Sequence, residues 1–190
     1  MRVVVIGVGA LGSNMLLAAR NAKVDWRIVD FDKVESKNTM SQFHTKMGLG
    51  KNKTLSLSQS LNGLWGVKVD TVPHKLTADN VHQLLHGADL VVDCLDNAAG
   101  RLIIQDYVRK HHIPCLHGAL APNGEFGRIV WDEFFQIDSE AGMGQATCED
   151  GEHLPFIMNV ACHMANSVLV YIKNLQKIGA EVHPNGFIRT

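Results

Sequence analysis

The sequence has almost no net charge, few cysteines and no repeated or low-complexity segment. Its 190 residues carry 18 basic and 19 acidic side chains, a balance that does not point to nucleic acid or to an anionic membrane as a partner. The four cysteines, Cys94, Cys115, Cys148 and Cys162, form no C-x-x-C pair. This spacing argues against zinc and against a disulfide framework, and it favours a reducing, cytoplasmic setting. The first apolar strand follows the initial methionine almost directly, which leaves no room for a signal peptide.

One apolar segment, residues 154–175, is long enough to span a bilayer. However, Asn159, His163 and Asn166 put a polar stripe along one face of the expected helix, and such groups are costly in lipid. We therefore expect a helix that packs on a sheet or on a partner, and no membrane span. The length of 190 residues predicts a single domain, residues 1–190, with a substantial core.

Apolar runs alternate with helical patterns along the chain. Strands are expected at residues 3–8, 26–30, 67–72, 89–95, 114–120 and 127–131, and helices at 13–22, 54–61, 78–86, 100–111 and 154–178. Between them lie a long polar segment, residues 33–53, and an irregular loop, residues 136–153. Strands that alternate with helices predict an α/β fold, here a Rossmann-like domain with a mainly parallel sheet flanked by helices.

Three glycines follow the first strand in the stretch "VVVIGVGALGSN". Gly7, Gly9 and Gly12 have the spacing G-x-G-x-x-G, which allows a tight turn, a close approach of backbone N–H groups to a phosphate, and close packing of the next helix. Asp30 ends the second expected strand, where a carboxylate can accept hydrogen bonds from a ribose. These residues predict a bound nucleotide, and they fit a nicotinamide dinucleotide and ATP equally well.

The polar segment after the second strand favours ATP. It contains a second aspartate, Asp32, and five lysines, the last of which is Lys53. A dinucleotide has little use for so many cations beyond its ribose, whereas an ATP that is attacked at its α-phosphate needs positive charge near the leaving pyrophosphate. Asp96 and Asn97 follow the strand expected at residues 89–95, at the sheet edge where such folds bind ligands. Asp96 is therefore placed to hold a Mg²⁺ ion that bridges phosphate oxygens.

Several motifs together resemble those of the ThiF/MoeB family. They are G-x-G-x-x-G-S from Gly7, the aspartate pair Asp30 and Asp32, G-x-x-K from residue 50 to residue 53, and D-L-V-V-D-C-x-D-N-x-x-x-R from residue 89 to residue 101. The motifs occur in the family's order within residues 1–132, and "HGALAPNGEFGRIVW" looks like the family's next pair of strands. This family has the adenylyltransferase fold of ubiquitin-activating enzymes and of the activators of sulfur-carrier proteins.

The resemblance implies ATP-dependent adenylation, with Mg²⁺, of the C-terminal carboxylate of a small ubiquitin-like or sulfur-carrier protein or of a peptide. It also implies a homodimer, and the apolar surface of the last helix points the same way. Carried over by position, the ribose ligand is Asp30, the phosphate ligand is Lys53 and the Mg²⁺ ligand is Asp96. Arg101 is expected to orient the Asp96 loop. The residues expected to contact the nucleotide are Gly7, Gly9, Gly12, Asp30, Asp32, Asn38, Gln42, Lys53 and Asn97.

One position departs from the family's pattern. Ser41 stands where the family usually has an arginine that contacts the phosphates. The loss of one cation that stabilises a transition state commonly lowers the rate by about a hundredfold or more, which puts the activity of this adenylyltransferase in doubt. Two alternatives stay open: a nucleotide-binding module of the same fold that is not catalytic or depends on a partner, and an NAD(P)-dependent oxidoreductase.

Some family members pass the adenylated carboxylate to a cysteine. Cys148, in a polar stretch, is the candidate for such a thioester, although the acidic residues that follow it disfavour a thiolate. Cys94 and Cys115 are expected to be buried in strands, and Cys162 in a helix core. His117, at a strand end, is a candidate substrate contact, with a purely structural role as the alternative.

Overall fold

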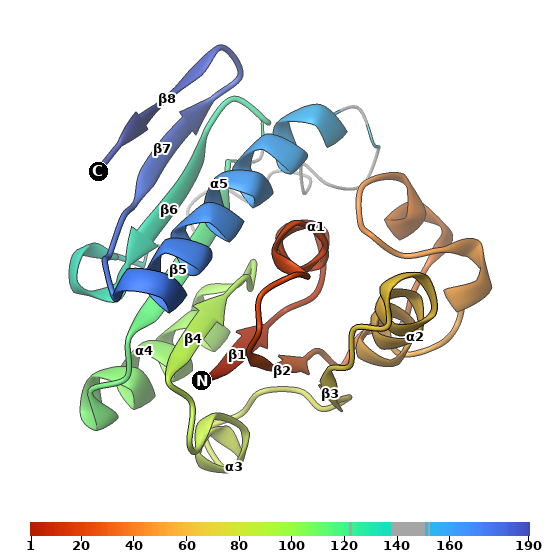
Figure 1. The fold of residues 1–190 in the computed structure, drawn as a ribbon, viewed down its shortest axis with the longest axis horizontal. Helices are drawn as coiled ribbons and strands as arrows, with labels where there is room; N and C mark the ends of the chain where they lie inside the picture. Colours follow the sequence, from red (N-terminus) through yellow and green to blue (C-terminus); the bar gives the residue numbers. More distant parts are fainter. Residues whose placement is uncertain (122, 138–150, 152) are drawn as a thin grey trace.

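The computed structural model describes residues 1–121, 123–137, 151 and 153–190. Within them the strands form one eight-stranded sheet in the order β3-β2-β1-β4-β5-β6-β7-β8 (Figure 1). Neighbouring strands from β3 to β5 are parallel, and those from β5 to β8 are antiparallel. The strands are β1 (Arg2–Ile6), β2 (Asp25–Val29), β3 (Asp70–Val72), β4 (Leu90–Asp93), β5 (Cys115–Leu120), β6 (Gly127–Trp131), β7 (Ala180–His183) and β8 (Gly186–Arg189). The helices are α1 (Ala10–Ala19), α2 (Lys53–Trp65), α3 (Val81–Leu85), α4 (Ala98–His111) and α5 (Leu154–Asn174), with 3₁₀ turns η1 (Ser36–Met40), η2 (Lys46–Gly48) and η3 (Asp132–Phe134).

Different helices cover the two faces of the sheet, because side chains alternate along each strand. Val3 and Val5 of β1 face a core that is shared with α1, α2 and α5. Val4 and Ile6 face a second core, shared with α3 and α4. Figure 1 shows the chain starting at the central strand β1 and ending at the edge strand β8. The sequence of β1 is continuously apolar because this strand is buried on both faces. The mainly parallel sheet with helices on both sides confirms the expected Rossmann-like fold.

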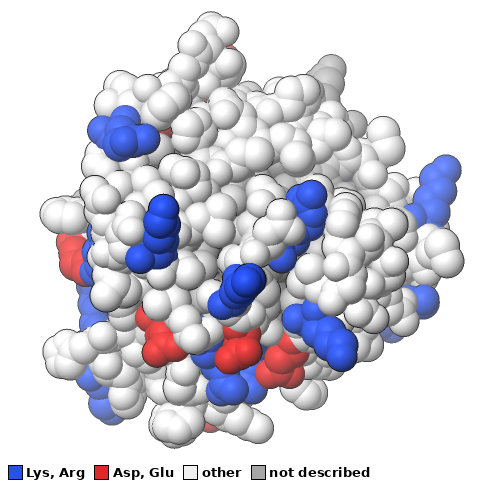
Figure 2. Space-filling view, viewed as in Figure 1, with Lys and Arg blue, Asp and Glu red and all other residues white. Residues whose placement is uncertain are grey.

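The long apolar helix α5 packs inside this fold. By length and composition alone it could cross a membrane, but 50% of its most apolar window is buried within the protein. Val160, Met164 and Val168 have no exposed surface and belong to the core that α5 shares with α1. Figure 2 shows a mostly white surface on this face of the molecule, with positive and negative side chains lying next to one another in its lower part. The packing of α5 on the sheet agrees with the helix that the polar stripe predicts.

The C-terminal region differs from its prediction. The last helix ends at Asn174, not at residue 178, because Leu175 adopts a left-handed conformation with φ 57°. The residues that follow form β7 and β8, two strands of four residues each that the sequence pattern does not predict. They extend the sheet by antiparallel pairing of β7 with β6 and of β8 with β7. This pairing depends on the tertiary structure, so the local pattern of apolar residues does not predict it. The expected strand at 67–72 and helix at 78–86 are also shorter, limited to β3 and α3.

Candidate functional site

The turn after β1 is as tight as the glycine spacing predicts. Gly7 has a φ of +87°, and a Cβ there would lie 2.9 Å from the carbonyl oxygen of Cys94. A Cβ on Gly12 would lie 2.0 Å from the carbonyl oxygen of Gly7, because α1 packs directly against the turn. The fold itself therefore requires glycine at both positions.

Gly9 is different, because the space beside it is open. The nearest atom to a Cβ on Gly9 would be Nε2 of Gln42, at 4.0 Å. Gly9 is the N-cap of α1, and no side chain in the described part of the chain caps this helix. The N–H groups of the first helical turn are therefore left for a ligand or water. Together with the helix dipole, they form a site suited to an anion such as a phosphate.

Asp30 follows β2 and supports this turn. Its Oδ2 accepts a hydrogen bond from the backbone N–H of Val8 at 2.8 Å, and its Oδ1 accepts one from that of Asp32 at 2.9 Å. Burial raises the pKa of Asp30, while these hydrogen bonds and the nearby Lys53 oppose the rise. The carboxylate thus lies beside the glycine turn, where a ribose ligand is expected, and it also fixes the turn's backbone.

Lys53 begins α2 and faces the end of β2. Its Nζ lies 3.0 Å from Oδ2 of Asp32, and its backbone N–H donates to the carbonyl oxygen of Asp32 at 2.8 Å. Asn52 caps α2 and donates its side-chain amide to the carbonyl oxygens of Asp30 and Asp32. The start of α2 is therefore tied to the end of β2, and the amine of Lys53 is held close to the two aspartates.

The segment between β2 and α2 places Asn38 and Gln42 differently. The side-chain oxygen of Asn38 accepts a hydrogen bond from the backbone N–H of Glu35 at 2.9 Å, so this amide supports η1. Oε1 of Gln42 is buried with no hydrogen-bond partner among the described residues, close to Gly9. His44, which no sequence motif singles out, donates from Nε2 to the carbonyl oxygen of Val8, and burial lowers its pKa to about 4. Gln42 therefore places its side-chain amide beside Gly9, and a neutral His44 donates to the backbone of the glycine turn.

Ser41 lies in a closed site. Only 1% of its surface is exposed, and its carbonyl oxygen accepts a hydrogen bond from Nδ2 of Asn14 in α1 at 2.9 Å. The hydroxyl of Ser13 accepts one from the backbone N–H of Phe43 at 2.9 Å. Helix α1 thus anchors the segment beside the glycine turn. An arginine side chain at position 41 would have to displace its neighbours, so this loop is built around the smaller residue.

The loop after β4 carries Asp96 at the same edge of the sheet. Asp96 is exposed, and its Oδ1 lies 3.5 Å from Nδ2 of Asn97. Asn97 caps α4, because its side-chain oxygen accepts a hydrogen bond from the backbone N–H of Gly100 at 2.8 Å. Arg101 donates to the carbonyl oxygen of Leu95, directly before Asp96. This contact agrees with the expected role of Arg101 in orienting the loop.

The structure corrects the expectations for two cysteines and favours the structural role of His117. Cys162 is exposed on α5 and does not lie in the helix core, because it falls on the outward face of the helix. Cys94 is only partly buried and follows β4, so it does not lie in a strand. His117 has no exposed surface, so it cannot contact a substrate directly. Cys115 is buried as expected, and burial raises its pKa. The described residues contain no group of three or more potential metal-ligating side chains, and Cys148 lies outside them.

The sequence is similar to a known protein family and to two of the proteins described next. The model of the ThiF family matches residues 1–187. The SAMP-activating enzyme E1 of Haloferax volcanii is 37% identical over 146 residues, which cover 70% of this chain and 54% of that protein. The sulfur carrier protein ThiS adenylyltransferase of Bacillus subtilis is 35% identical over 133 residues, which cover 66% of this chain and 38% of that protein. The chain thus spans about half, or less, of the length of these relatives.

Solved structures share the fold at low sequence identity. MccB of E. coli with ATP has a TM-score of 0.79 and 14% identity, covering 100% of this chain and 62% of that one. The tRNA N6-threonylcarbamoyladenosine dehydratase TcdA of E. coli, in complex with AMP, has a TM-score of 0.66 and 19% identity, covering 92% and 88% of the two chains. At these identities the likeness concerns the fold alone. Since the family model spans nearly the whole sequence, the chain belongs to the ThiF family.

Proposed function

We propose that this chain uses ATP and Mg²⁺ to adenylate the C-terminal carboxylate of a small ubiquitin-like or sulfur-carrier protein or of a peptide. The observation that carries the proposal is the uncapped N-terminus of α1 beside Gly9, with strand-end carboxylates and a lysine around it. This arrangement provides an anion site and side chains suited to a ribose and to a metal ion. The relatives in Haloferax volcanii and Bacillus subtilis are named as a SAMP-activating enzyme and a ThiS adenylyltransferase.

In the proposed reaction, an oxygen of the substrate carboxylate attacks the α-phosphorus of ATP. The bond from this phosphorus to the bridging oxygen breaks, pyrophosphate leaves, and an acyl adenylate remains. The first turn of α1 binds phosphate oxygens through its N–H groups, and Asp30 accepts hydrogen bonds from the ribose. Lys53 donates to the phosphates, where its charge stabilises the leaving pyrophosphate. Asn38, Gln42 and Asn97 line the pocket.

The residues present fit a Mg²⁺ ion. Mg²⁺ is bound in nucleotide sites by one or two carboxylates together with phosphate oxygens and waters. Asp96 offers an exposed carboxylate at the ligand edge of the sheet, and its contact with Asn97 is long, at 3.5 Å. Asp96 would hold the ion; Asp32, which follows β2 at the same edge of the sheet, is a second, half-exposed carboxylate. When bound, Mg²⁺ supplies positive charge that offsets the charge of the phosphates.

The isotope exchange between pyrophosphate and ATP tests this proposal. Exchange is expected only when a small protein that ends in Gly-Gly is present, because the reverse reaction needs the acyl adenylate. Asp96→Ala should abolish exchange while the protein stays folded. Asp25→Ala is the matched control, since Asp25 is an exposed carboxylate at the opposite end of the parallel strands.

The other candidate functions predict different results in the same assays. ATP binding without exchange would favour a module that is not catalytic or needs a partner. Binding of NAD or NADP in preference to ATP would favour an oxidoreductase. If Cys148 forms a thioester, the substrate should become attached to the protein in a bond that thiols cleave and that Cys148→Ala removes.

A further inference from the structure

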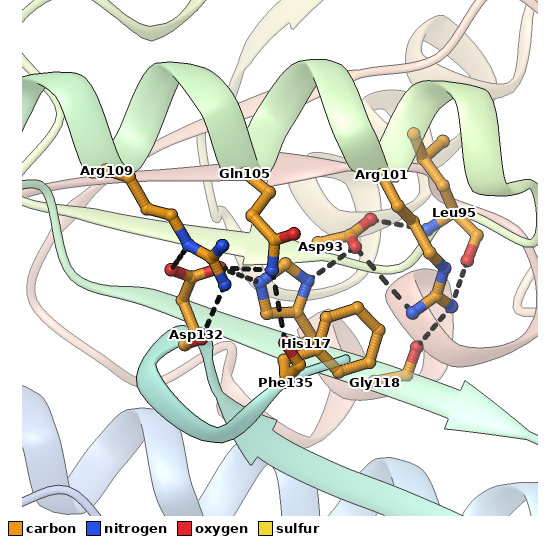
Figure 3. Close-up of polar contacts among 9 residues, drawn as sticks. All are labelled: Asp93, Leu95, Arg101, Gln105, Arg109, His117, Gly118, Asp132 and Phe135. Carbon is orange, nitrogen blue, oxygen red and sulfur yellow. Dashed lines mark hydrogen bonds and ion pairs between the residues drawn. The ribbon is translucent and has the colours of Figure 1, made fainter. Parts of the chain in front are cut away.

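A buried polar cluster lies beside the loop that follows β4 (Figure 3). We name it the His117 cluster; its buried members are Asp93, Arg101, His117 and Asp132, and the exposed Arg109 lies at its rim. His117 comes from β5 and lies between two carboxylates, as Figure 3 shows. Its Nδ1 is 2.7 Å from Oδ2 of Asp93, and its Nε2 is 3.1 Å from Oδ1 of Asp132. Both His117 and Asp93 are fully buried.

The imidazole of His117 is charged in this setting. Each ring nitrogen faces an oxygen of a carboxylate, and carboxylates only accept hydrogen bonds, so both nitrogens must carry a proton. Burial alone would lower the pKa of His117, but the hydrogen bonds to Asp132 and Asp93 outweigh it and raise the pKa to about 11. The imidazolium also allows two carboxylates to be buried close together, which their mutual repulsion would otherwise oppose.

The cluster holds the backbone that leads to Asp96. Oδ1 of Asp93 accepts a hydrogen bond from the backbone N–H of Leu95 at 2.9 Å. Arg101 donates to the carbonyl oxygen of Leu95, and also to that of Gly118 at 2.9 Å. Leu95 directly precedes Asp96, so both polar backbone groups of this residue are fixed by cluster side chains. Asp93 thus accepts a hydrogen bond from the loop with Oδ1 and one from His117 with Oδ2.

The far end of the cluster is braced by α4 and η3. Arg109 donates from Nε to Oδ2 of Asp132 at 2.7 Å, and Gln105 donates to Oδ1 of Asp132 at 2.9 Å. Figure 3 shows Arg101, Gln105 and Arg109 on one face of α4, the face toward the cluster, as their spacing of four residues dictates; Arg109 reaches Asp132, and Arg101 reaches Leu95 and Gly118. Phe135 stacks on the imidazole at 4.1 Å between ring centroids. The ring is therefore held on both edges and on one face.

We propose that the His117 imidazolium is a positioning residue for the β4 loop. It holds Asp93 in the orientation that fixes Leu95, and through Leu95 it sets the direction of the Asp96 carboxylate. The inference rests on the proposed function, in which Asp96 is the residue that holds Mg²⁺. The His117 side chain has no exposed surface and cannot contact a metal ion bound at Asp96. Any effect of His117 on the metal must therefore pass through Asp93 and the loop.

The test compares His117→Gln with Ile129→Ala. Ile129 is fully buried in the other core, so its truncation lowers stability without touching the cluster. Two quantities are measured: hydrogen exchange of the Leu95 amide, and the Mg²⁺ concentration that gives half-maximal Mg²⁺-dependent ATP binding. In His117→Gln the exchange should be faster and the Mg²⁺ concentration about 10- to 100-fold higher, the range seen for outer-shell partners of metal ligands. Ile129→Ala should leave the Mg²⁺ concentration unchanged.

Each outcome decides the inference. Wild-type values in His117→Gln, or an equal Mg²⁺ shift in Ile129→Ala, would overturn it. If His117→Gln does not fold, His117→Asn takes its place, because this shorter amide also cannot donate to both carboxylates. Faster exchange of the Leu95 amide in that variant supports the inference, and wild-type exchange refutes it. A wild-type protein that binds no ATP with Mg²⁺ would refute the proposed function, while hydrogen exchange at Leu95 would still test the positioning.

Discussion

Two glycine substitutions in the same turn separate the needs of the fold from those of a ligand. A methyl group on Gly9 would meet no atom closer than 4.0 Å, so it would not clash with the rest of the protein. We expect Gly9→Ala to lower the free energy of unfolding by only about 1–2 kcal/mol, because alanine is a poorer N-cap and the residue's ψ of −141° is less favourable for alanine than for glycine. Gly12→Ala should cost about 3 kcal/mol or more, because its Cβ would lie 2.0 Å from the carbonyl oxygen of Gly7.

The same methyl group on Gly9 should obstruct a phosphate. It would occupy the open space beside the first turn of α1, where N–H groups are free to donate to an anion. A hydrogen bond to a charged group contributes about 1.5–3 kcal/mol, so losing one should weaken ATP binding by roughly 10- to 150-fold. Calorimetric titration gives the affinity, and urea unfolding gives the stability. Gly9→Ala that folds normally and binds ATP as tightly as the wild type would show that the phosphates do not lie on this turn.

Three further predictions concern charge and assembly. Lys53→Ala should weaken ATP binding by about 1.5–3 kcal/mol in calorimetry, whereas Lys23→Ala, which removes an exposed lysine elsewhere, should not. Stability should fall as the pH rises above 6.5, because folded His117, with its pKa raised to about 11, keeps a proton that the unfolded chain releases. His117→Gln should remove this fall in urea unfolding between pH 6.5 and about 8, below the pH at which the buried Cys94 and Cys115 contribute a slope of the same sign. The protein should be a homodimer, and light scattering that gives the mass of one chain at micromolar concentration would contradict this.

The parts of the site that sequence alone predicts are local. The glycine turn, Asp30 at the end of β2 and Asp96 after β4 lie where strand-turn-helix patterns place them, because each depends on a few consecutive residues. The length of the segment between β2 and α2 is also visible in the sequence. Its anchoring on α1 is not, because the hydrogen bonds of Ser13 and Asn14 reach residues far along the chain.

The His117 cluster could not be predicted for the same reason. Asp93, His117 and Asp132 are far apart in the sequence and meet only because β4 pairs with β5 and β5 with β6. The only local signal is that His117 and Asp93 are polar residues in otherwise apolar strands. Such residues must be satisfied by partners when they are buried, but the sequence does not say which partners. The sequence does not predict the last two strands, β7 and the edge strand β8, for a related reason, since their pairing is tertiary.

The pairing of Lys53 with Asp32 does not prevent the lysine from binding phosphate. The Lys53 side chain is 9% exposed, but that of Asp32 is 48% exposed. If the amine turns to a phosphate, the Asp32 carboxylate can be hydrated, so breaking a pair with one solvated partner costs about 0–1 kcal/mol. The hydrogen bond gained to a charged phosphate is worth about 1.5–3 kcal/mol, which exceeds this cost. Under the proposed function, the ion pair would therefore hold the amine of Lys53 beside Asp32 before a nucleotide arrives, and the phosphate would then compete successfully for it.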